Sequence, residues 1–314
     1  MAGEHMQMLG ASQSTEELVV MRRSSSALAR LLEVFSPAAA FNALSQVPAP
    51  CGHLQRTTGI SMAEPLKLGD TVTVIGASGN VGKLVALRLS KQFKVRGVVR
   101  SASKVRPFLQ DKVELFEADL NEPTEVLDEK LQAALSGAHA VVICTGTTAF
   151  PTKAWSPTGE TEVTGAVLSA WLGSGLNVRE AVAKLDAEGL NTPKNVDEDG
   201  TRAILKSWAA AAGANRKRFI MMSSIGVQRR DQMPFPVLNT CGVLDAKAAA
   251  EAAVKADAEA GGYSYTVVRP GQLFGGPYDN NFYLGTLFEL DKAKPQDVQM
   301  ASGDTLMGDT LRST

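Results

Sequence analysis

The sequence predicts an α/β protein in which a parallel β-sheet carries helices on both faces. Two observations indicate this fold class. Short apolar and β-branched runs alternate with helical patterns along residues 67–314, as in parallel strands joined by crossover helices. At residues 71–82 (TVTVIGASGNVG), one such run leads directly into a glycine-rich turn and a helix start. The 314 residues are enough for one large domain of this class with an appendage.

Six strands are expected, and right-handed crossovers order them 3-2-1-4-5-6, the doubly wound Rossmann arrangement. The expected strands cover residues 71–75, 94–99, 113–118, 138–144, 218–223 and 263–268. The expected helices cover residues 81–91, 104–109, 123–135, 196–212 and 244–260. Pro123 suits the first turn of its helix, where a backbone N–H has no intrahelical partner. Gly213 and Gly261 follow the last turns of the final two helices.

Residues 147–194, after the fourth strand, are too long for a simple connection. They contain Trp155, Trp171 and an amphipathic pattern over residues 178–185, so we expect a helical insertion. Two interpretations are open. The insertion is either a lid or partner-binding hairpin at the carboxyl edge of the sheet, or an addition with its own small core.

Residues 1–66 lack a convincing core pattern and are expected to be a targeting leader or a disordered extension, with the Rossmann domain at 67–314. A leader fits best from Met21, because the following segment holds three arginines, three consecutive serines and one acid, Glu33. The SPAAAF segment resembles the cleavage region of algal plastid leaders. We therefore expect import into an organelle, the plastid stroma before the mitochondrion, with a cytoplasmic protein as the alternative.

The bulk composition excludes several classes of protein. A net charge of −1 with mixed charges predicts no nucleic-acid partner, and the apolar runs are too short for a transmembrane segment. Cys51, Cys144 and Cys241 share no metal-ligand spacing, so no metal site is expected. The partner is expected to be a small-molecule substrate or another protein, and the sequence does not define the oligomeric state.

The glycine-rich turn has the form of a pyrophosphate site. Gly76 permits the sharp turn after the strand, Gly79 lets backbone approach phosphate, and Gly82 lets the helix pack tightly on the strand. The first-turn N–H groups of that helix then point at the anion. The residues of the turn expected to contact a dinucleotide are Gly76, Ser78, Gly79, Asn80, Val81 and Gly82.

The end of the second strand indicates which dinucleotide is bound. Domains that bind NAD place an acidic residue there to hold the ribose 2′-OH. This chain has Arg100 instead, with Lys104 close behind it. A guanidinium can hold a 2′-phosphate with paired hydrogen bonds, whereas a carboxylate would repel it. The pattern favours NADP(H) as the cofactor; the alternative is that both residues are solvated loop charges.

An ordered set of motifs resembles the atypical short-chain dehydrogenase/reductases, in the NmrA-like and the plant and algal NAD(P)-binding branch. The motifs are GASGNVG, VVR at the end of the second strand, EADL (117–120), SS-G (223–226), AKAAAE (246–251) and VVRPGQL (267–273). The resemblance covers residues 71–314 apart from the insertion. It implies a Rossmann fold and NADP(H)-dependent oxidation or reduction of a small organic substrate.

The resemblance also implies roles at matching positions on the carboxyl ends of the strands. Asp119 and Leu120 would lie along the adenine, and Thr145 and Gly146 would line the cofactor beyond the fourth strand. Lys247 would hydrogen-bond the nicotinamide ribose. Pro270 and Gly271 would sit beside the nicotinamide.

One departure from the family concerns the catalytic residues. Typical members of the wider superfamily carry Tyr-x-x-x-Lys, with the tyrosine as general acid. Here Lys247 is present, but Val243 stands where the tyrosine would be, while Ser223 or Ser224 occupies the usual serine place. The candidate catalytic residues are therefore Lys247 and Ser223. Alternatively, Lys247 is a surface lysine that pairs with Glu251.

Two functions are consistent with this incomplete set. In a reductase, either Lys247 itself would serve as the acid or the substrate would need little help from a proton donor, and residues 271–285 would line the substrate pocket. In a non-catalytic NADP(H)-dependent redox sensor or organelle assembly factor, the fold would report cofactor state to a partner. The family also continues beyond the segment that matches GDTLRST, so we expect a C-terminal truncation.

Overall fold

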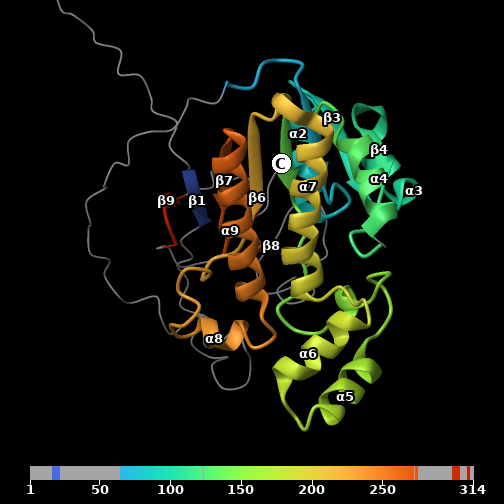
Figure 1. Ribbon diagram of the computed structural model, residues 1–314, viewed down its shortest axis with the longest axis vertical. Coiled ribbons are helices and arrows are strands. Elements are labelled where there is room, and N and C mark those ends of the chain that lie inside the picture. The colour runs from blue at the N-terminus through green and yellow to red at the C-terminus, as the bar shows by residue number, and fades with distance from the viewer. Residues whose placement is uncertain are drawn as a thin grey trace, which may run out of the picture.

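The computed structural model describes residues 16–21, 64–122, 124–271, 273–274, 299–304 and 310–311 (Figure 1). Six parallel strands form the centre of its main sheet in the order β4-β3-β2-β5-β6-β7. These are β2 (Thr71–Ile75), β3 (Lys94–Val99), β4 (Glu114–Glu117), β5 (Ala140–Ile143), β6 (Arg218–Met222) and β7 (Ser264–Val268). The predicted doubly wound Rossmann order is confirmed.

Helices cover both faces of this sheet. One face carries α2 (Asn80–Leu89) and α3 (Ala102–Leu109); the other carries α4 (Thr124–Leu135), α7 (Gly200–Ala212) and α9 (Val243–Gly261) (Figure 1). Helix α4 follows Pro123, which lies outside the described residues. Shorter helical segments are η2 (Gln110–Lys112), η3 (Lys153–Trp155), η5 (Gly213–Asn215) and α8 (Phe235–Leu238). The predicted helix over 196–212 is divided, because a π-helix, η4 (Lys194–Asp199), precedes α7.

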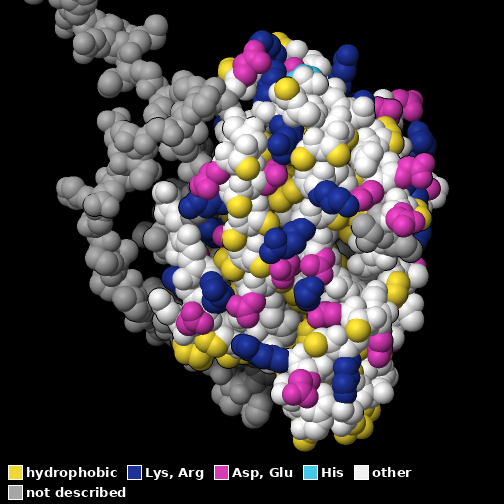
Figure 2. Space-filling view, viewed as in Figure 1, with side chains coloured by type: hydrophobic (Ala, Val, Ile, Leu, Met, Phe, Trp, Pro, Cys, Tyr) yellow, Lys and Arg dark blue, Asp and Glu magenta, His cyan; other side chains and the backbone are white. Residues whose placement is uncertain are grey.

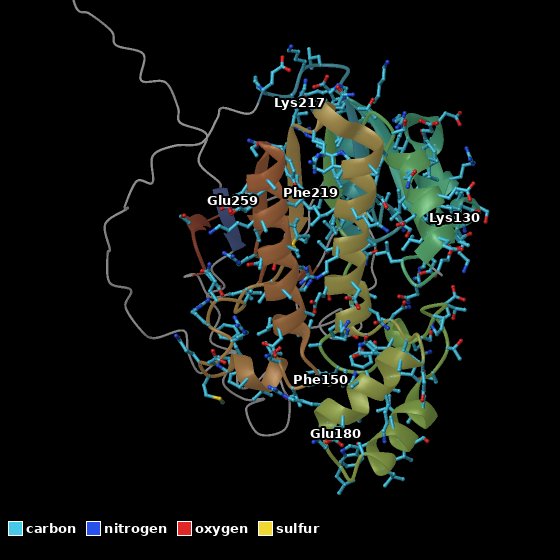
Figure 3. All side chains as sticks on the ribbon, viewed as in Figure 1. Lys130, Phe150, Glu180, Lys217, Phe219 and Glu259 are labelled. Carbon is cyan, nitrogen blue, oxygen red and sulfur yellow. The ribbon has the colours of Figure 1, made fainter. Side chains whose placement is uncertain are left out.

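The period-two alternation of the strands separates the core into two layers. Val72 and Val74 of β2 pack toward α2 and α3, whereas Ile75 belongs to the larger cluster under α4, α7 and α9. Trp208 is fully buried in that larger cluster and contacts Phe219, which Figure 3 shows between α7 and α9. Its indole N–H donates to the carbonyl of Ala138 at 2.9 Å, so the one polar atom of the ring is satisfied.

The insertion after β5 folds around a small core of its own. It contains η3, α5 (Thr164–Gly173) and α6 (Val178–Ala187), packed around the fully buried Trp155. This favours the interpretation of an addition with its own core. Leu168, Trp171, Leu172 and Leu176 are exposed large hydrophobic residues, and Figure 2 shows apolar side chains gathered at this end of the molecule. Within the described residues, no helix is both long and apolar enough to cross a membrane.

Strands beyond β7 extend the sheet. β1 (Glu16–Met21) pairs parallel with β7 and antiparallel with β9 (Gln299–Ser302). A separate pair is formed by β8 (Leu273–Phe274) and β10 (Thr310–Leu311). Strand β1 comes from the segment expected to be a leader or disordered extension, where no strand was predicted. The assignment of residues 1–66 to a leader stays a prediction.

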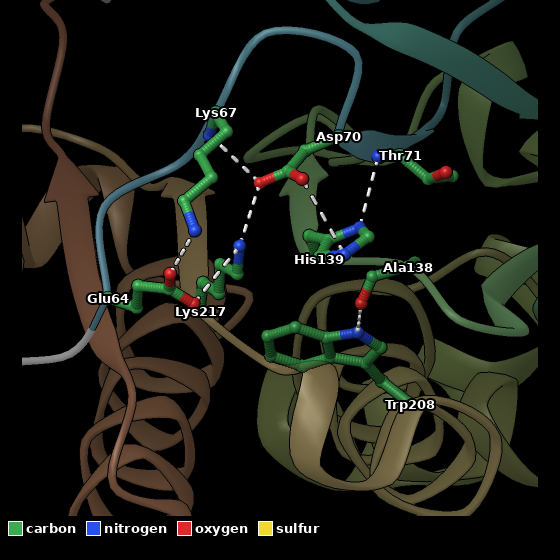
Figure 4. A network of polar contacts seen from close by, with 8 residues as sticks. All are labelled: Glu64, Lys67, Asp70, Thr71, Ala138, His139, Trp208 and Lys217. Carbon is green, nitrogen blue, oxygen red and sulfur yellow. Dashed lines mark hydrogen bonds and ion pairs between the residues drawn. The ribbon is translucent and has the colours of Figure 1, made fainter.

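A polar network ties together the amino-terminal ends of three central strands (Figure 4). The carboxylate of Asp70, just before β2, accepts hydrogen bonds from the Lys67 backbone N–H at 2.9 Å and from the Lys217 ammonium at 3.0 Å. His139, just before β5, accepts a hydrogen bond on Nδ1 from the Thr71 N–H at 3.1 Å. Its Nε2 lies 3.6 Å from Asp70. His139 therefore has a structural role at the edge opposite the glycine turn.

We predict that Asp70→Asn lowers the free energy of unfolding by about 1–2 kcal/mol at neutral pH, because it weakens two charge-assisted hydrogen bonds. Burial opposes ionisation of Asp70, but the bonds from Lys67 and Lys217 outweigh it and hold the pKa of this carboxyl below its usual value. A lowered folded-state pKa adds stability above the unfolded-state value of about 4, and this stability is lost as the pH falls further.

Urea titrations of wild type and variant from pH 7 to pH 3 test this prediction, and the difference between the two should shrink below about pH 4. Glu64→Gln is the matched control, because that exposed carboxylate pairs with the same Lys217 at 3.5 Å. The role given to Asp70 would be contradicted if the loss in free energy of unfolding did not depend on pH, or if both variants lost the same amount.

Candidate functional site

The glycine turn joins β2 to α2 at the carboxyl edge of the sheet. The Gly76 N–H donates to the carbonyl of Val98 at 3.0 Å, and the Gly79 N–H donates to the Gly76 carbonyl at 3.0 Å. Gly79 is the N-cap of α2, and no side chain caps that helix. The first turn also contains no acidic residue. The helix therefore presents its positive end and its uncapped N–H groups to an anion.

At two positions of the turn, neighbouring atoms lie so close to the backbone that only glycine fits. A Cβ added at Gly82 would lie 2.1 Å from the Gly76 carbonyl oxygen, so no larger residue fits between helix and turn. Gly76 has a φ of 77°, and a Cβ there would lie 2.8 Å from Cγ2 of Thr145. The turn and the loop after β5 thus lie against each other, and the cradle fits a group that needs close backbone contact.

The other predicted cofactor residues follow parallel strands at the same edge. Asp119 follows β4, and its Oδ1 accepts from the Asn121 N–H at 3.2 Å. Leu120 packs against Gly200 of α7, where an added Cβ would be 3.0 Å away. The carbonyl of Pro270, after β7, accepts from the Ile225 N–H at 2.9 Å. The positions brought to this edge by their strands are Ser78, Asn80, Val81, Thr145, Gly146 and Gly271.

Lys247 forms a buried ion pair with Asp197. Lys247 Nζ lies 2.8 Å from Asp197 Oδ1, and the two side chains are 9% and 2% exposed. A Cβ added at Gly146 would lie 3.5 Å from that oxygen and 3.6 Å from the ammonium, so the pair lies beside the predicted cofactor loop. The other carboxylate oxygen, Oδ2, has no hydrogen-bond partner among the described residues. Lys247 is therefore not a surface lysine paired with Glu251.

Sequence reasoning missed Asp197. It lies in η4, a π-helical turn of the kind that often occurs at functional sites. Its neighbours Glu198 and Asp199 form surface ion pairs with Arg202 and Lys194. Three consecutive acids resemble a solvated helix face, and only the extra residue in the turn directs the first of them inward.

The hydroxyl of Ser223 is hydrogen-bonded away from Lys247. Its hydroxyl donates to Glu251 Oε1 at 2.5 Å, and Glu251 also accepts two hydrogen bonds from the Arg269 guanidinium, at 3.0 and 2.6 Å. Arg269 is 1% exposed. No hydrogen bond joins Ser223 to Lys247 in the part of the chain that the structure describes. The hydroxyl proton of Ser223 is thus directed to Glu251 and not toward the lysine.

No described tyrosine replaces the missing acid beside Lys247. Val243, the first residue of α9, is buried in an apolar cluster with Ile225 and Phe235. Tyr263 donates to Asp257 at 2.6 Å near the far end of α9, and burial, followed by that carboxylate, raises the pKa of its hydroxyl. Tyr278, Tyr283 and most of the predicted substrate segment 271–285 lie outside the described residues.

Two further features bear on the location of the site. Burial raises the pKa of the Cys144 thiol, at the end of β5, to about 12, which disfavours the reactive thiolate at neutral pH. A cleft over α9 and β7 contains none of the predicted cofactor residues; it is lined by Glu251, Lys255, Arg269 and neighbouring side chains. Strand topology and the glycine turn favour the carboxyl edge as the dinucleotide site instead.

Arg100 and Lys104 both contact the insertion. Nη1 of Arg100, at the end of β3, donates to the carbonyl of Pro157 at 3.1 Å. Nζ of Lys104, in α3, donates to Glu160 Oε1 at 2.6 Å. The interpretation of these residues as merely solvated charges is therefore incomplete, because one turn of the insertion contacts both.

A doubly wound sheet with an uncapped helix behind a glycine turn defines a dinucleotide-binding protein. The sequence model of the NAD(P)H-binding family matches residues 76–298, which is more than half of the chain. The chain belongs to this family. The resemblance to atypical short-chain dehydrogenase/reductases is confirmed at this level, and the plant and algal branch stays a prediction. A comparison with curated proteins gave no significant match.

Solved structures with a similar fold include an alcohol dehydrogenase from Thermococcus sibiricus complexed with 5-hydroxy-NADP. It is 17% identical with a TM-score of 0.46, and the match covers 65% of this chain and 77% of that one. A short-chain type dehydrogenase/reductase from Mycobacterium ulcerans is 18% identical, with a TM-score of 0.45 and coverages of 67% and 70%. An anaerobilin reductase from Escherichia coli O157:H7 is 17% identical, with a TM-score of 0.41 and coverages of 66% and 75%.

We predict that Asp197→Leu and Lys247→Met each lower the free energy of unfolding by about 3–5 kcal/mol, because each leaves one buried charge without its partner. The double variant should recover most of that loss, because it removes both charges together. Urea denaturation measures all three. Arg202→Met is the control. It removes an exposed ion pair between Arg202 and Glu198, and should lower the free energy of unfolding by less than about 1 kcal/mol. If the single variants lose no more stability than this control, the assignment of a buried ion pair is contradicted.

Proposed function

We propose that the protein is an NADP(H)-dependent oxidoreductase that acts on a small organic substrate. The observation that carries the choice of cofactor is the pair of cations, Arg100 and Lys104, at the end of the second sheet strand, where a domain selective for NAD needs a carboxylate. The guanidinium offers paired donors to a 2′-phosphate, and the ammonium adds a point charge. The glycine turn and the positive end of α2 supply the pyrophosphate contacts.

Lys247 is the group proposed to act on the substrate side. Asp197 fixes its ammonium beside Gly146, so its remaining N–H bonds are available to a ribose hydroxyl or to a substrate oxygen. A bound nicotinamide supplies or accepts the hydride. With Val243 in place of a tyrosine, the role of proton donor falls to this lysine.

A second function, a non-catalytic NADP(H)-dependent regulator, is favoured by two observations. The hydroxyl of Ser223 is bonded to Glu251 and is not presented to a carbonyl. The insertion also exposes Leu168, Trp171, Leu172 and Leu176. In this function the cofactor would control binding of a protein partner without any turnover.

We predict that Arg100→Ala weakens NADPH binding by about 10- to 100-fold and changes NADH binding less than twofold, because only NADPH loses a charge-assisted phosphate contact. Fluorescence titration of both cofactors measures these affinities. Arg106→Ala, which changes an exposed arginine on α3, is the matched control and should leave both affinities unchanged. The NADP assignment is wrong if NADPH binds no better than NADH and Arg100→Ala alters neither.

We predict stereospecific hydride transfer from NADPH to a quinone or an enone, reduced at least 100-fold by Lys247→Met. The Asp197→Leu, Lys247→Met double variant is the control for misfolding. It should still bind NADPH but should not transfer hydride. Lys255→Ala, an exposed lysine on the same helix, should keep the wild-type rate. NADPH-dependent capture of a protein partner through residues 147–194, with no turnover of any acceptor, would favour the regulator instead.

A further inference from the structure

One turn of the insertion spans both proposed phosphate-binding residues. The turn, residues 157–160, touches Arg100 through the Pro157 carbonyl at 3.1 Å and touches Lys104 through the Glu160 carboxylate at 2.6 Å. Gly159 lies in the turn between Pro157 and Glu160, and a Cβ added there would be 2.8 Å from Nη2 of Arg100. The backbone of the turn therefore packs directly on the guanidinium.

Glu160 acts as the counter-ion of both cations. The hydrogen bond from Lys104 and the attraction of that ammonium, with a smaller contribution from Arg100, hold the pKa of Glu160 below its usual range. The carboxylate is therefore charged at neutral pH. The side chains of Lys104 and Glu160 are 67% and 69% exposed, so water competes for their contact and the ion pair is weak.

The base of the turn is held much more firmly than its tip. The buried side-chain amide of Asn191 donates to the carbonyl of Ser156 and accepts from the Asn121 amide, beside the loop that follows β4. Its backbone N–H donates to the Trp155 carbonyl at 2.7 Å, and its carbonyl accepts from the Thr147 hydroxyl at 2.9 Å. The insertion is thus fixed to the cofactor edge, while Glu160 reaches the cations from an exposed tip.

We propose that Glu160 competes with the cofactor: its carboxylate, bonded to Lys104 and near Arg100, holds the place of the 2′-phosphate, and NADP(H) displaces it. The inference rests on the proposed NADP(H) function. A phosphate monoester carries nearly two charges and three acceptor oxygens, so it replaces a single exposed carboxylate on these donors. NAD(H) has no group that exchanges with Glu160, so the turn stays on the cations when that cofactor is bound.

Cofactor titration of the purified full-length Glu160→Gln variant tests this competition. The dissociation constant for NADPH should fall about two- to fivefold, the scale of one exposed ion pair, while that for NADH stays unchanged. Glu162→Gln is the matched control, because Glu162 lies two residues further on and pairs with Lys153 at 3.1 Å. It should change neither constant.

Hydrogen exchange in the turn provides a second readout that does not depend on affinity. The N–H groups of Gly159, Glu160 and Thr161 are bonded within the turn, to Ser156 or Thr158. NADPH should speed their exchange in the wild type, because it releases Glu160 from Lys104, whereas NADH should not. In Glu160→Gln, exchange should already be faster without cofactor.

The outcomes separate this inference from the proposed function. If Arg100→Ala weakens NADPH binding but Glu160→Gln changes neither dissociation constant, the inference is overturned and the NADP assignment stands. If Glu160→Gln weakens NADH binding alone, Glu160 is a ligand of the ribose 2′-OH, and the inference is again overturned. If Arg100→Ala alters neither affinity, both proposals fail together.

Discussion

The contact between α2 and the glycine turn is the constraint on which the rest of the site depends. Because the position of Gly82 lies against the Gly76 carbonyl, the helix starts immediately behind the turn and directs its positive end to the edge of the sheet. Gly76 in turn lies against Thr145, which fixes the loop after β5 relative to the same turn. The remaining loops then reach this edge because parallel strands all end there.

Polar groups at the two ends of the sheet serve different purposes. At the amino-terminal edge, Asp70, His139 and Lys217 satisfy one another and join strand ends that are far apart in sequence. At the carboxyl edge, Asp197 and Lys247 are also paired, but both partners keep hydrogen-bonding capacity that no other described residue uses. A buried pair with unused donors and acceptors stabilises a fold poorly, and it suits a site that a ligand completes.

Much of the fold could be predicted because its signals are local. Most of the six central strands are short runs rich in apolar residues, and β2 and β3 have the predicted bounds. The features that were missed depend on distant pairing. Asp197 meets Lys247 only through the extra residue of η4, and EELVVM becomes β1 only because β7 offers an open edge. Nothing within either segment distinguishes it from a solvated helix face or part of a leader.

The hydrogen bonds of Asn191 limit how the insertion could be lost from this protein. Its side chain and backbone bond to the insertion, to Asn121 and to Thr147. Excision of residues 147–194 would therefore remove the partner of Asn121, a residue of the Rossmann domain itself, at the edge where the cofactor is expected. The insertion is therefore not an interchangeable module, and a shortened relative would need a compensating substitution at Asn121.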